Sequence, residues 1–449
     1  MSFSSLLATK TAKYHTLGCK LNFSETATFS RRLEELGVRT VTGNEPADLC
    51  FVNTCSVTEV ANQKGRQLIK RLIRENPDAF VVVTGCYAQL SPEEVASIDG
   101  VDLVLGSDEK ARLVEHVLQA WMPRLEQPEL KATEIHTVDK ARDIQSFAPS
   151  CSRGNRTRYF LKVQDGCNYF CTYCTIPFAR GLSRNPSIES LVAQAQSVAA
   201  EGGKEIVLTG VNIGDFGRTT GESFLELVKA LNRVEGIQRY RISSLEPDLI
   251  DDELITFCAS SRAFMPHFHI PLQSGSDTVL QLMHRRYDTE LFKDKIKLIK
   301  TVMPDAFIGV DVMVGTRGER PEHFQECYDF LASLDVTQLH VFPYSERPGT
   351  AALKIPYIVS PAEKKERTRR LIALSDEKTH QFYARHIGAE RTVLFEKAPD
   401  GKAMHGFTDN YLRVELPAAA SNHLLDNQMR QVRLLDFNTD KSALMAELL

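Results

Sequence analysis

The 449-residue chain is predicted to be an α/β protein with two α/β lobes and a small all-β module at its C-terminal end. Three observations lead to this prediction. Apolar, β-branched runs alternate with helical patterns over residues 1–130 and again over 153–387, as in parallel sheets covered by helices. After Gly388 the pattern changes to short alternating segments, which indicates antiparallel strands. An apolar content of 43% supplies a sizeable core.

The first lobe, residues 1–130, reads as a Rossmann-like, doubly wound domain. Strands are expected in "YHTLGC", "ADLCFVNTC", "AFVVVTGC" and "VDLVLGS", with a helix from "NFSETATFSRRLEELG" that ends at Gly37. Cys19, Cys55 and Cys86 fall at or just past the C-terminal ends of three of these strands. That edge of an open α/β sheet is where ligands bind, so the three thiols are expected to converge.

Residues 131–152 are irregular in pattern and are expected to form a linker. The second lobe, 153–387, offers six strands: "RYFLKVQDG", "KEIVLTGVNIG", "QRYRISSLEP", "MPHFHIPLQ", "AFIGVDVMVG" and "VTQLHVFPY". Six β/α units fit a partial (β/α)6 barrel better than a full eight-fold one. A long helix follows from "PAEKKERTRR", and residues 388–449 form the all-β module.

Composition excludes some classes of protein. No apolar run reaches about 18 residues and no signal peptide precedes the first lobe, so we expect a cytoplasmic protein without a membrane span. The net charge of −4 gives no general attraction to nucleic acid. Ten cysteines in a reducing compartment favour metal binding or burial over disulfides, and Cys50, Cys258 and Cys327 read as core.

Three cysteines crowd the segment "GCNYFCTYC", which follows the first strand of the second lobe. Cys167, Cys171 and Cys174 lie within eight residues, in a loop at the expected C-terminal face of the barrel, where such folds place active sites. Thiolates ligate iron–sulfur clusters, and three ligands on a four-iron cluster leave one iron open. A zinc site completed by Cys151 or Cys258 is the alternative, and unconnected buried thiols are another.

The spacing C-x3-C-x-aromatic-C, set after the first strand of a β/α barrel, resembles the radical S-adenosylmethionine (SAM) signature. The motifs "TLGCKLN", "VNTCSV", "TGCYAQ", "IPFARGLSRNP", "LTGVNIGDFG", "HIPLQSGSD", "VDVMVGTRGE" and "PYSERPGT" resemble those of the radical SAM methylthiotransferase family. "GFTDNYLRVEL" resembles the TRAM module of that family. The resemblance covers nearly the whole chain, in the expected order.

The resemblance implies two [4Fe-4S] clusters and SAM as cofactors. Catalytic Cys167, Cys171 and Cys174 would hold one cluster, and Cys19, Cys55 and Cys86 the other, auxiliary cluster. Strand-end residues would contact SAM, and their alternative role is packing or helix capping. This SAM set comprises Tyr173, Thr209, Gly210, Ser243, Glu246, Gln273, Val312 and Gly315.

The implied reaction places a methylthio group at an unreactive C–H bond. One SAM would donate a methyl group to sulfur at the auxiliary cluster, and a second would yield the radical. "TLGCKLN" is most similar to the branch that modifies C2 of N6-threonylcarbamoyladenosine at tRNA position 37. The branches acting on isopentenyladenosine or on a ribosomal-protein aspartate remain alternatives, as does a non-catalytic iron–sulfur RNA-binding protein.

Expected partners are a tRNA anticodon stem-loop, a flavodoxin- or ferredoxin-type electron donor and a sulfur source. The protein itself is expected to be a monomer. Arg180 and Arg184 are candidates for holding a phosphate or the substrate carboxylate. In the last module, Phe407 and Asn410 offer stacking and hydrogen bonds to an unpaired loop. From Gly388 onward seven Lys/Arg face nine Asp/Glu, a poor electrostatic match for RNA.

Overall fold

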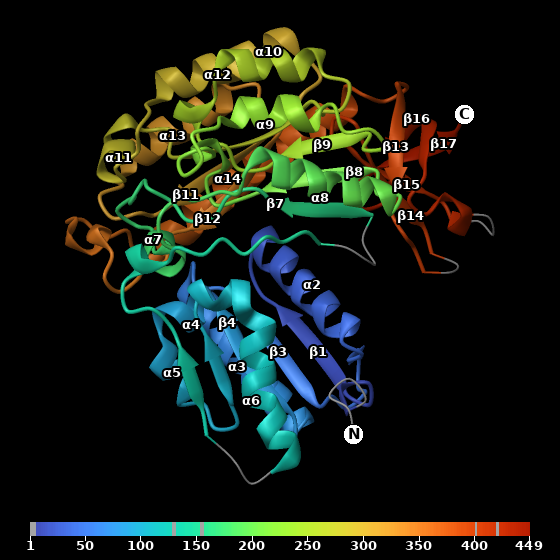
Figure 1. Cartoon of the computed structure of the whole chain (residues 1–449). Coiled ribbons are helices and arrows are strands. Elements are labelled where there is room, and N and C mark those ends of the chain that lie inside the picture. Colours follow the sequence, from blue (N-terminus) through green and yellow to red (C-terminus); the bar gives the residue numbers. More distant parts are fainter. Residues whose placement is uncertain (1–5, 128–131, 153–156, 400–401, 419–421) are drawn as a thin grey trace.

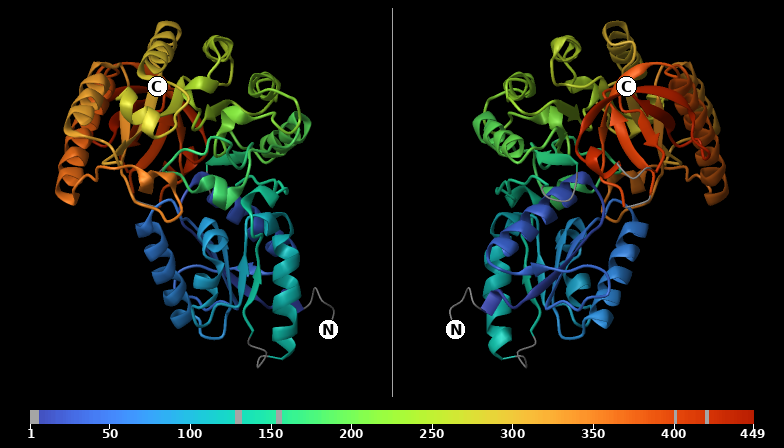
Figure 2. Two further views of the ribbon diagram at one scale, coloured as in Figure 1. Left: turned by 90° about the vertical axis from the view of Figure 1, so that its left-hand side faces the viewer. Right: turned by 90° about the vertical axis from the view of Figure 1, so that its right-hand side faces the viewer.

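The computed structural model describes residues 6–127, 132–152, 157–399, 402–418 and 422–449. Two α/β lobes lie one above the other, and a β-barrel sits beside the upper lobe (Figure 1). The two side views show the first lobe below the partial barrel in the same arrangement (Figure 2). The predicted class, two α/β lobes followed by a small all-β module, is confirmed.

The first lobe is built on a six-stranded, all-parallel sheet in the order β2-β1-β3-β4-β5-β6. Its strands are β1 (Thr11–Thr16), β2 (Arg39–Thr40), β3 (Leu49–Thr54), β4 (Phe80–Gly85), β5 (Leu103–Leu105) and β6 (Glu134–His136). Its helices are α2 (Lys20–Glu35), α3 (Glu59–Glu75), α4 (Cys86–Leu90), α5 (Pro92–Ala96) and α6 (Leu113–Glu126), with 3-10 turns η1 (Asp108–Arg112) and η2 (Ala141–Asp143).

Every residue of β3 and β4 is buried, because helices cover both faces of the sheet. One face packs against α2 and α6 through Phe29, Phe51 and Trp121, and the other packs against α3 through Val52 and Ile69. The region expected to be an irregular linker differs in one respect. Its segment β6 pairs in parallel with β5 and so extends the sheet of the first lobe.

The second lobe has two parallel three-stranded sheets, β7-β8-β9 and β10-β11-β12, which together make a partial barrel of six strands. The strands are β7 (Arg158–Lys162), β8 (Glu205–Thr209), β9 (Arg239–Ile242), β10 (His267–Gln273), β11 (Phe307–Val314) and β12 (Gln338–Pro343). The helices are α7 (Ile176–Arg180), α8 (Ile188–Ala200), α9 (Phe224–Leu231), α10 (Asp252–Ser260), α11 (Asp277–Leu282), α12 (Thr289–Val302), α13 (Pro321–Ser333) and α14 (Pro361–Ala384), with turns η3 (Ile213–Asp215), η4 (Pro247–Leu249) and η5 (Ala351–Lys354).

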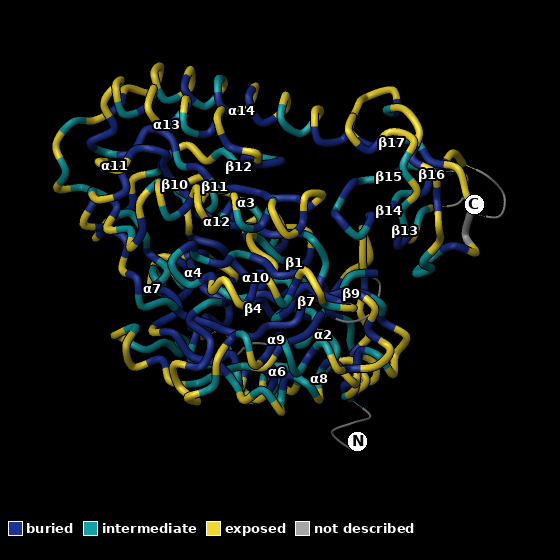
Figure 3. Tube along the Cα trace, turned by 90° about the horizontal axis from the view of Figure 1, so that it is seen from above, coloured by how far each residue is buried: buried dark blue, intermediate teal, exposed yellow. Residues whose placement is uncertain are grey.

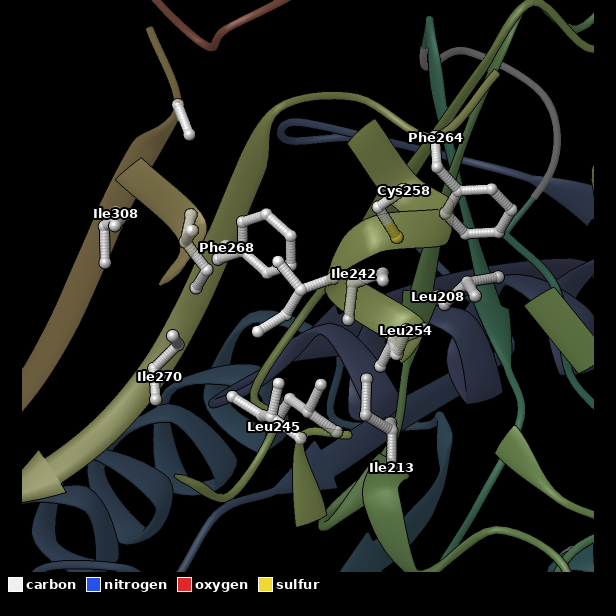
Figure 4. Close-up of a cluster of buried hydrophobic side chains, with 14 of the residues drawn as sticks. Leu208, Ile213, Ile242, Leu245, Leu254, Cys258, Phe264, Phe268, Ile270 and Ile308 are labelled. Carbon is white, nitrogen blue, oxygen red and sulfur yellow. The ribbon is translucent and has the colours of Figure 1, made fainter. Parts of the chain in front are cut away.

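The core of this lobe lies between the strands and the helices outside them. Alternate residues of the strands, such as Ile242, Ile270 and Ile308, point into it (Figure 4). Cys258, considered above as a fourth zinc ligand, lies in this apolar cluster near Phe264. Viewed from above, β10 and β11 are mostly buried and β12 ends in exposed residues, while the outer turns of helices such as α14 are exposed (Figure 3). The opposite faces of the strands therefore look into the barrel.

The C-terminal module is a closed barrel in the order β13-β14-β15-β17-β16, which fits the expected TRAM module. Its strands are β13 (Glu390–Phe395), β14 (Met404–Thr408), β15 (Arg413–Leu416), β16 (Met429–Phe437) and β17 (Leu444–Leu448), with turn η6 (Asn422–Leu425). The module docks at the N-terminal ends of the second-lobe strands, at the end opposite α7 (Figure 1). Buried Arg239 and Arg241 of β9 donate to the carbonyl oxygens of Phe407 and Thr408.

Within the described ranges, no helix combines the length and the apolar character needed to cross a membrane. All ten cysteines lack disulfide partners, and those predicted to be core, Cys50, Cys258 and Cys327, are buried. Cys151 is buried as well and forms an isolated antiparallel bridge with Leu161 of β7.

Candidate active site

A tight loop after β7 holds Cys167, Cys171 and Cys174. The loop starts at Gly166, whose φ of +72° and close approach to the carbonyl of Leu182 leave no room for a Cβ. It is closed by a backbone bond from the Cys167 N–H to the Gly181 oxygen at 3.0 Å. A second bond, from the Cys174 N–H to the Cys171 oxygen, is also 3.0 Å long. The short chain thus folds back to place three thiols in one loop.

Each sulfur of this loop receives an N–H donor. The Tyr169 and Ile176 backbone groups approach the Sγ of Cys167 and Cys174 at 3.5 and 3.4 Å, and Arg285 Nη1 approaches Cys171 Sγ at 3.2 Å. Burial nevertheless raises the pKa of Cys167 to about 12. Burial thus favours the neutral thiol, and a bound cation would be needed to favour the thiolate, which is the form that ligates metals.

A second set of three cysteines lies at the carboxyl edge of the first-lobe sheet. Cys19 follows β1, Cys55 follows β3 and Cys86 begins α4 after β4. Burial, and next the charge of Cys86, raise the pKa of Cys55 to about 12, with Cys19 acting in the same direction. Cys55 therefore senses the charges of the other two thiols, and the convergence of the three on one cluster stays a prediction.

A glycine with positive φ precedes the first and last cysteines of this set. At Gly18, φ is +100° and a Cβ would lie 2.9 Å from the Cys55 sulfur. At Gly85, φ is +101° and a Cβ would meet the backbone of Thr54. The dipeptide Gly-Cys also occurs at Gly166. It is a sequence signal for a cysteine that follows a tight turn, and it is separate from the hydrophobic pattern that predicts strands.

The spacing of the sulfurs separates a cluster from a single ion. A tetrahedral zinc with Zn–S bonds of about 2.3 Å brings its sulfurs to about 3.8 Å of one another. Among the described residues, which include all ten cysteines, neither trio gathers three sulfurs within 4.8 Å. A polynuclear centre, with a different iron at each thiolate, spaces its ligands more widely. The sulfur spacing therefore gives no support for the zinc alternative, and the iron–sulfur assignment of both trios stays a prediction.

A buried ion network joins the two lobes beside the trio of the first lobe. Glu25 of α2 contacts Lys110 at 2.5 Å, Lys162 at 3.1 Å and Arg180 at 3.1 Å. Asp165, two residues before Cys167, contacts Lys162 at 2.6 Å and Arg180 at 2.9 Å. Sequence patterns did not reveal Glu25 or Lys110, because an ion pair between residues 85 positions apart leaves no local signal.

The positive charge of this network acts on Cys55 and Cys86. Burial raises the pKa of Cys86, and Arg180, followed by Lys110, opposes that rise. Arg184 joins the same network through Asp165 at 3.4 Å. Arg180 and Arg184 are therefore buried and paired inside the protein, and their predicted contact with a substrate stays a prediction.

The other two candidate substrate residues lie at the module interface, near the starting ends of the barrel strands. The Phe407 ring lies 4.4 Å from the Arg158 guanidinium. Asn410 is fully buried, with its amide nitrogen 3.0 Å from His386 Nε2. The structure does not bring either residue to the cysteine loop, which follows the opposite end of β7.

The predicted SAM set gathers around the carboxyl ends of the strands. Thr209 ends β8, Gly210 directly follows it, and Val312 is buried in β11. The Ser243 hydroxyl is buried without a hydrogen-bond partner among the described residues. Gln273 ends β10 with an unusual φ of +69°. These positions are compatible with a ligand at the strand ends, and the individual contacts stay predictions.

Glu246 and Tyr173 are linked through Arg285, which sequence patterns did not reveal. Arg285 pairs with the Glu246 carboxylate and lies 3.5 Å from the Tyr173 hydroxyl. Burial raises the pKa of Glu246 to about 7, although Arg285 opposes that rise. Gly315, the last member of the set, has φ +75° and packs against Lys364 of α14.

A partial β/α barrel with a three-cysteine loop after its first strand defines the radical SAM class. The family model described as Radical SAM superfamily matches residues 161–331, and the model described as Uncharacterized protein family UPF0004 matches 11–106. Among solved structures, the radical SAM methyltransferase TsrM from Kitasatospora setae aligns with a TM-score of 0.56 at 14% identity. The alignment covers 97% of this chain and 85% of that chain, which shows the shared fold.

Curated relatives define the family more narrowly. "Threonylcarbamoyladenosine tRNA methylthiotransferase MtaB" of Bacillus subtilis is 40% identical over 90% of both chains. Proteins of that name from Aquifex aeolicus and Thermotoga maritima are 36% and 34% identical over 90% of this chain, and over 95% and 91% of their own lengths. The chain belongs to this MtaB family of radical SAM methylthiotransferases.

Proposed function

We propose that this chain converts N6-threonylcarbamoyladenosine at tRNA position 37 into its 2-methylthio derivative. The carrying observation is the pair of cysteine trios, one per lobe, in two lobes that a buried ion network joins. The relatives that cover nine-tenths of the chain bear the name of this activity. A reaction on tRNA implies a cytoplasmic enzyme.

Cys167, Cys171 and Cys174 would hold the cluster that binds SAM, and Cys19, Cys55 and Cys86 would hold a second [4Fe-4S] cluster. When bound, these groups supply the radical that activates the substrate carbon and a site for the sulfur to be methylated. Adenine C2 has neither an acidic proton nor a leaving group, so acid–base catalysis alone gives little advantage there.

The residues of the chain position and screen these groups. N–H donors reach each sulfur of the second-lobe loop, and hydrogen bonds to sulfur tune cluster potentials. Glu246, Thr209 and Gly210 would bind SAM at the strand ends, and Tyr173 would lie against its adenine. The target base would have to leave its stack to reach C2.

We assign the auxiliary cluster to the first lobe, residues 1–130 extended by β6, and SAM binding to residues 153–387. The module at 388–449 would contact the anticodon stem-loop through residues such as Phe407. A flavodoxin- or ferredoxin-type donor would supply electrons, and an external source would supply sulfur.

The test uses anaerobically reconstituted protein, SAM, a reductant and anticodon stem-loops. Methylthiolation of the threonylcarbamoyl stem-loop, detected by nucleoside mass spectrometry, is expected. Product only with the isopentenyl stem-loop, or only on a ribosomal-protein aspartate, would contradict the proposal in favour of another branch. Failure to cleave SAM at all would favour a non-catalytic iron–sulfur protein.

A further inference from the structure

One segment of the second lobe contacts the first lobe beside its auxiliary trio. This bridging segment, residues 344–352, begins directly after β12. Its Arg347 donates from Nη2 to Ser56 Oγ at 3.0 Å and from Nη1 to Glu59 Oε2 at 2.8 Å. Ser56 is buried and directly follows Cys55. The bridging segment therefore holds the turn that carries one cysteine of the auxiliary trio.

A backbone hydrogen bond lies beside these contacts of Arg347. The N–H of Glu59, the first residue of α3, donates to Ser345 Oγ at 3.2 Å. The Arg347 side chain is 7% exposed, and its bond to Ser56 is buried, whereas the Glu59 carboxylate keeps contact with water. Hydrogen bonds from a charged guanidinium are stronger than those between neutral groups, and its planar fork fixes their direction. The two lobes are therefore held in a defined orientation at this point.

The other end of the bridging segment contacts the three-cysteine loop of the second lobe. The Ala352 N–H donates at 2.8 Å to the carbonyl oxygen of Thr172, which directly follows Cys171. Between the two ends, Thr350 Oγ1 donates to the Arg347 carbonyl oxygen at 2.7 Å and closes a turn. One short, internally bonded segment thus contacts the residue that follows a cysteine in each trio.

The bridging segment adds a junction between the lobes to the one made by the buried ion network. In that network Glu25 of the first lobe pairs with Lys162 and Arg180 of the second. Two lobes joined at one place can still rotate about it, and relative motion is the default for domains of one chain. A further junction between other residues, at Ser56, restricts this rotation. The two junctions together therefore restrict how the two trios can lie relative to each other.

The proposed reaction depends on that placement. The sulfur to be methylated would lie at the first-lobe trio and the radical would arise at the second-lobe trio, so both must reach one substrate carbon. A shift of about 1 Å between reacting groups can lower a rate by about 100-fold. Cleavage of SAM needs the second-lobe trio, whereas methylthio transfer needs both trios. Loss of the bridging contacts is therefore expected to affect transfer more than cleavage.

We propose that Arg347 is a positioning residue that sets the auxiliary trio against the SAM-binding trio for methylthio transfer. This inference rests on the proposed function. Arg347 acts through Ser56 and the adjacent Cys55 in the first lobe, and through the bridging segment on the loop of the second lobe. Lysine would keep the charge but lacks the planar fork that donates to Ser56 and Glu59 together.

The test measures the methylthiolated nucleoside formed per 5′-deoxyadenosine released from SAM, with reconstituted protein and the threonylcarbamoyl stem-loop. Arg347→Met is expected to keep the wild-type iron content. It should cleave SAM within about threefold of the wild-type rate but lower the product ratio by about 10-fold or more. Arg347→Lys should recover part of the ratio. The control, Arg369→Met, removes an exposed arginine bonded to Glu366 of the same helix α14, and it should keep the wild-type ratio.

A second readout reports placement without chemistry. Hydrogen exchange of the reconstituted protein, without SAM or RNA, is followed at the amides of Glu59 and Ala352. These amides donate to Ser345 at one end of the bridging segment and to Thr172 at the other. Arg347→Met is expected to speed exchange at both amides, because the bridging segment loses the side chain that joins the lobes.

Several results would overturn the positioning role. One is an unchanged product ratio in Arg347→Met, which includes an equal fall of SAM cleavage and methylthiolation, and another is unchanged exchange at both amides. If Arg347→Met loses iron, Ser345→Ala decides, because it removes the acceptor of the Glu59 N–H. It should lower the ratio about two- to tenfold, the range for a neutral hydrogen bond, and an unchanged ratio overturns the role. Absence of SAM cleavage or methylthiolation by wild type instead overturns the proposed function.

Discussion

Neutralising Glu25 should destabilise the first lobe more than any surface charge change would. The Glu25 side chain is 7% exposed and contacts Lys110, Lys162 and Arg180, whose side chains are 3%, 1% and 1% exposed. Glu25→Gln keeps the shape but leaves Asp165 as the acidic partner of Lys162 and Arg180, and it removes the carboxylate that pairs with Lys110. Removing one partner of a buried pair typically costs about 3–5 kcal/mol, so we expect a loss of about 3 kcal/mol or more.

The assay is urea unfolding under anaerobic conditions, followed by the fluorescence of Trp121. It is the single tryptophan of the chain and is buried in the first lobe. With a slope of about 1–3 kcal/mol per molar urea, the midpoint should fall by about 1 M or more. Glu115→Gln is the control, because Glu115 is 58% exposed and lies 4.0 Å from Arg32, and it should cost less than about 1 kcal/mol. Equal urea midpoints for Glu25→Gln and Glu115→Gln would contradict this expectation.

The difference in unfolding free energy between wild type and Glu25→Gln should depend on pH. Burial alone would raise the pKa of Glu25, but Arg180, Lys110 and Lys162 together lower it well below the ordinary value of 4.5. A carboxyl group with a lowered pKa in the folded state stabilises fully above its unfolded pKa and loses this contribution as pH falls. The difference between wild type and Glu25→Gln should therefore be constant above about pH 5 and shrink below about pH 4.

Three other predictions concern the auxiliary trio and its lobe. Cys19→Ala should lower reconstituted iron from about eight to about four atoms per chain; unchanged iron would contradict its role as a ligand. Gly18→Ala places a Cβ 2.7 Å from the Cys55 Cβ at a residue whose φ is +100°. It should lower the free energy of unfolding, measured by Trp121 fluorescence, by at least about 1–2 kcal/mol. A wild-type unfolding midpoint would argue against this tight turn. Arg347 donates to Ser56 at 3.0 Å across the lobes, so Arg347→Met should speed hydrogen exchange just after Cys55, and unchanged exchange would count against this contact.

Local hydrophobic patterns predicted strands and helices well where burial alone decides the conformation. The runs around Cys50 and Val82 are buried on both faces of a parallel sheet, and they form strands as expected. The short strand β6 escaped prediction because three residues carry too little periodicity, and pairing with β5 decides its conformation. The sequence shows only that residues 18 and 85 are glycines. Their positive φ is needed because a Cβ there would meet Cys55 or the backbone of Thr54, at the end of the neighbouring strand β3.

Some residues of the candidate site could be found from local sequence patterns, and others could not. Close spacing along the chain revealed Cys167, Cys171 and Cys174, and strand-end positions indicated the other trio. Arg285 is separated from Cys171 by 114 residues, and no periodic pattern records that their side chains meet. Arg180 and Arg184 could be picked out as basic residues after the cluster loop, but whether they face solvent or an internal carboxylate depends on the packing of the two lobes.

Residue type and local spacing were enough to predict the order of the three structural units, to indicate the two cysteine trios and to reveal the family resemblance. How charges from different lobes combine became visible in the folded chain alone. Glu25 pairs with Lys162 across the lobe boundary, and Asp311 lies between two histidines from adjacent strands. Such contacts arise from docking of distant segments, where electrostatic interaction depends on distance in space and not on distance along the chain.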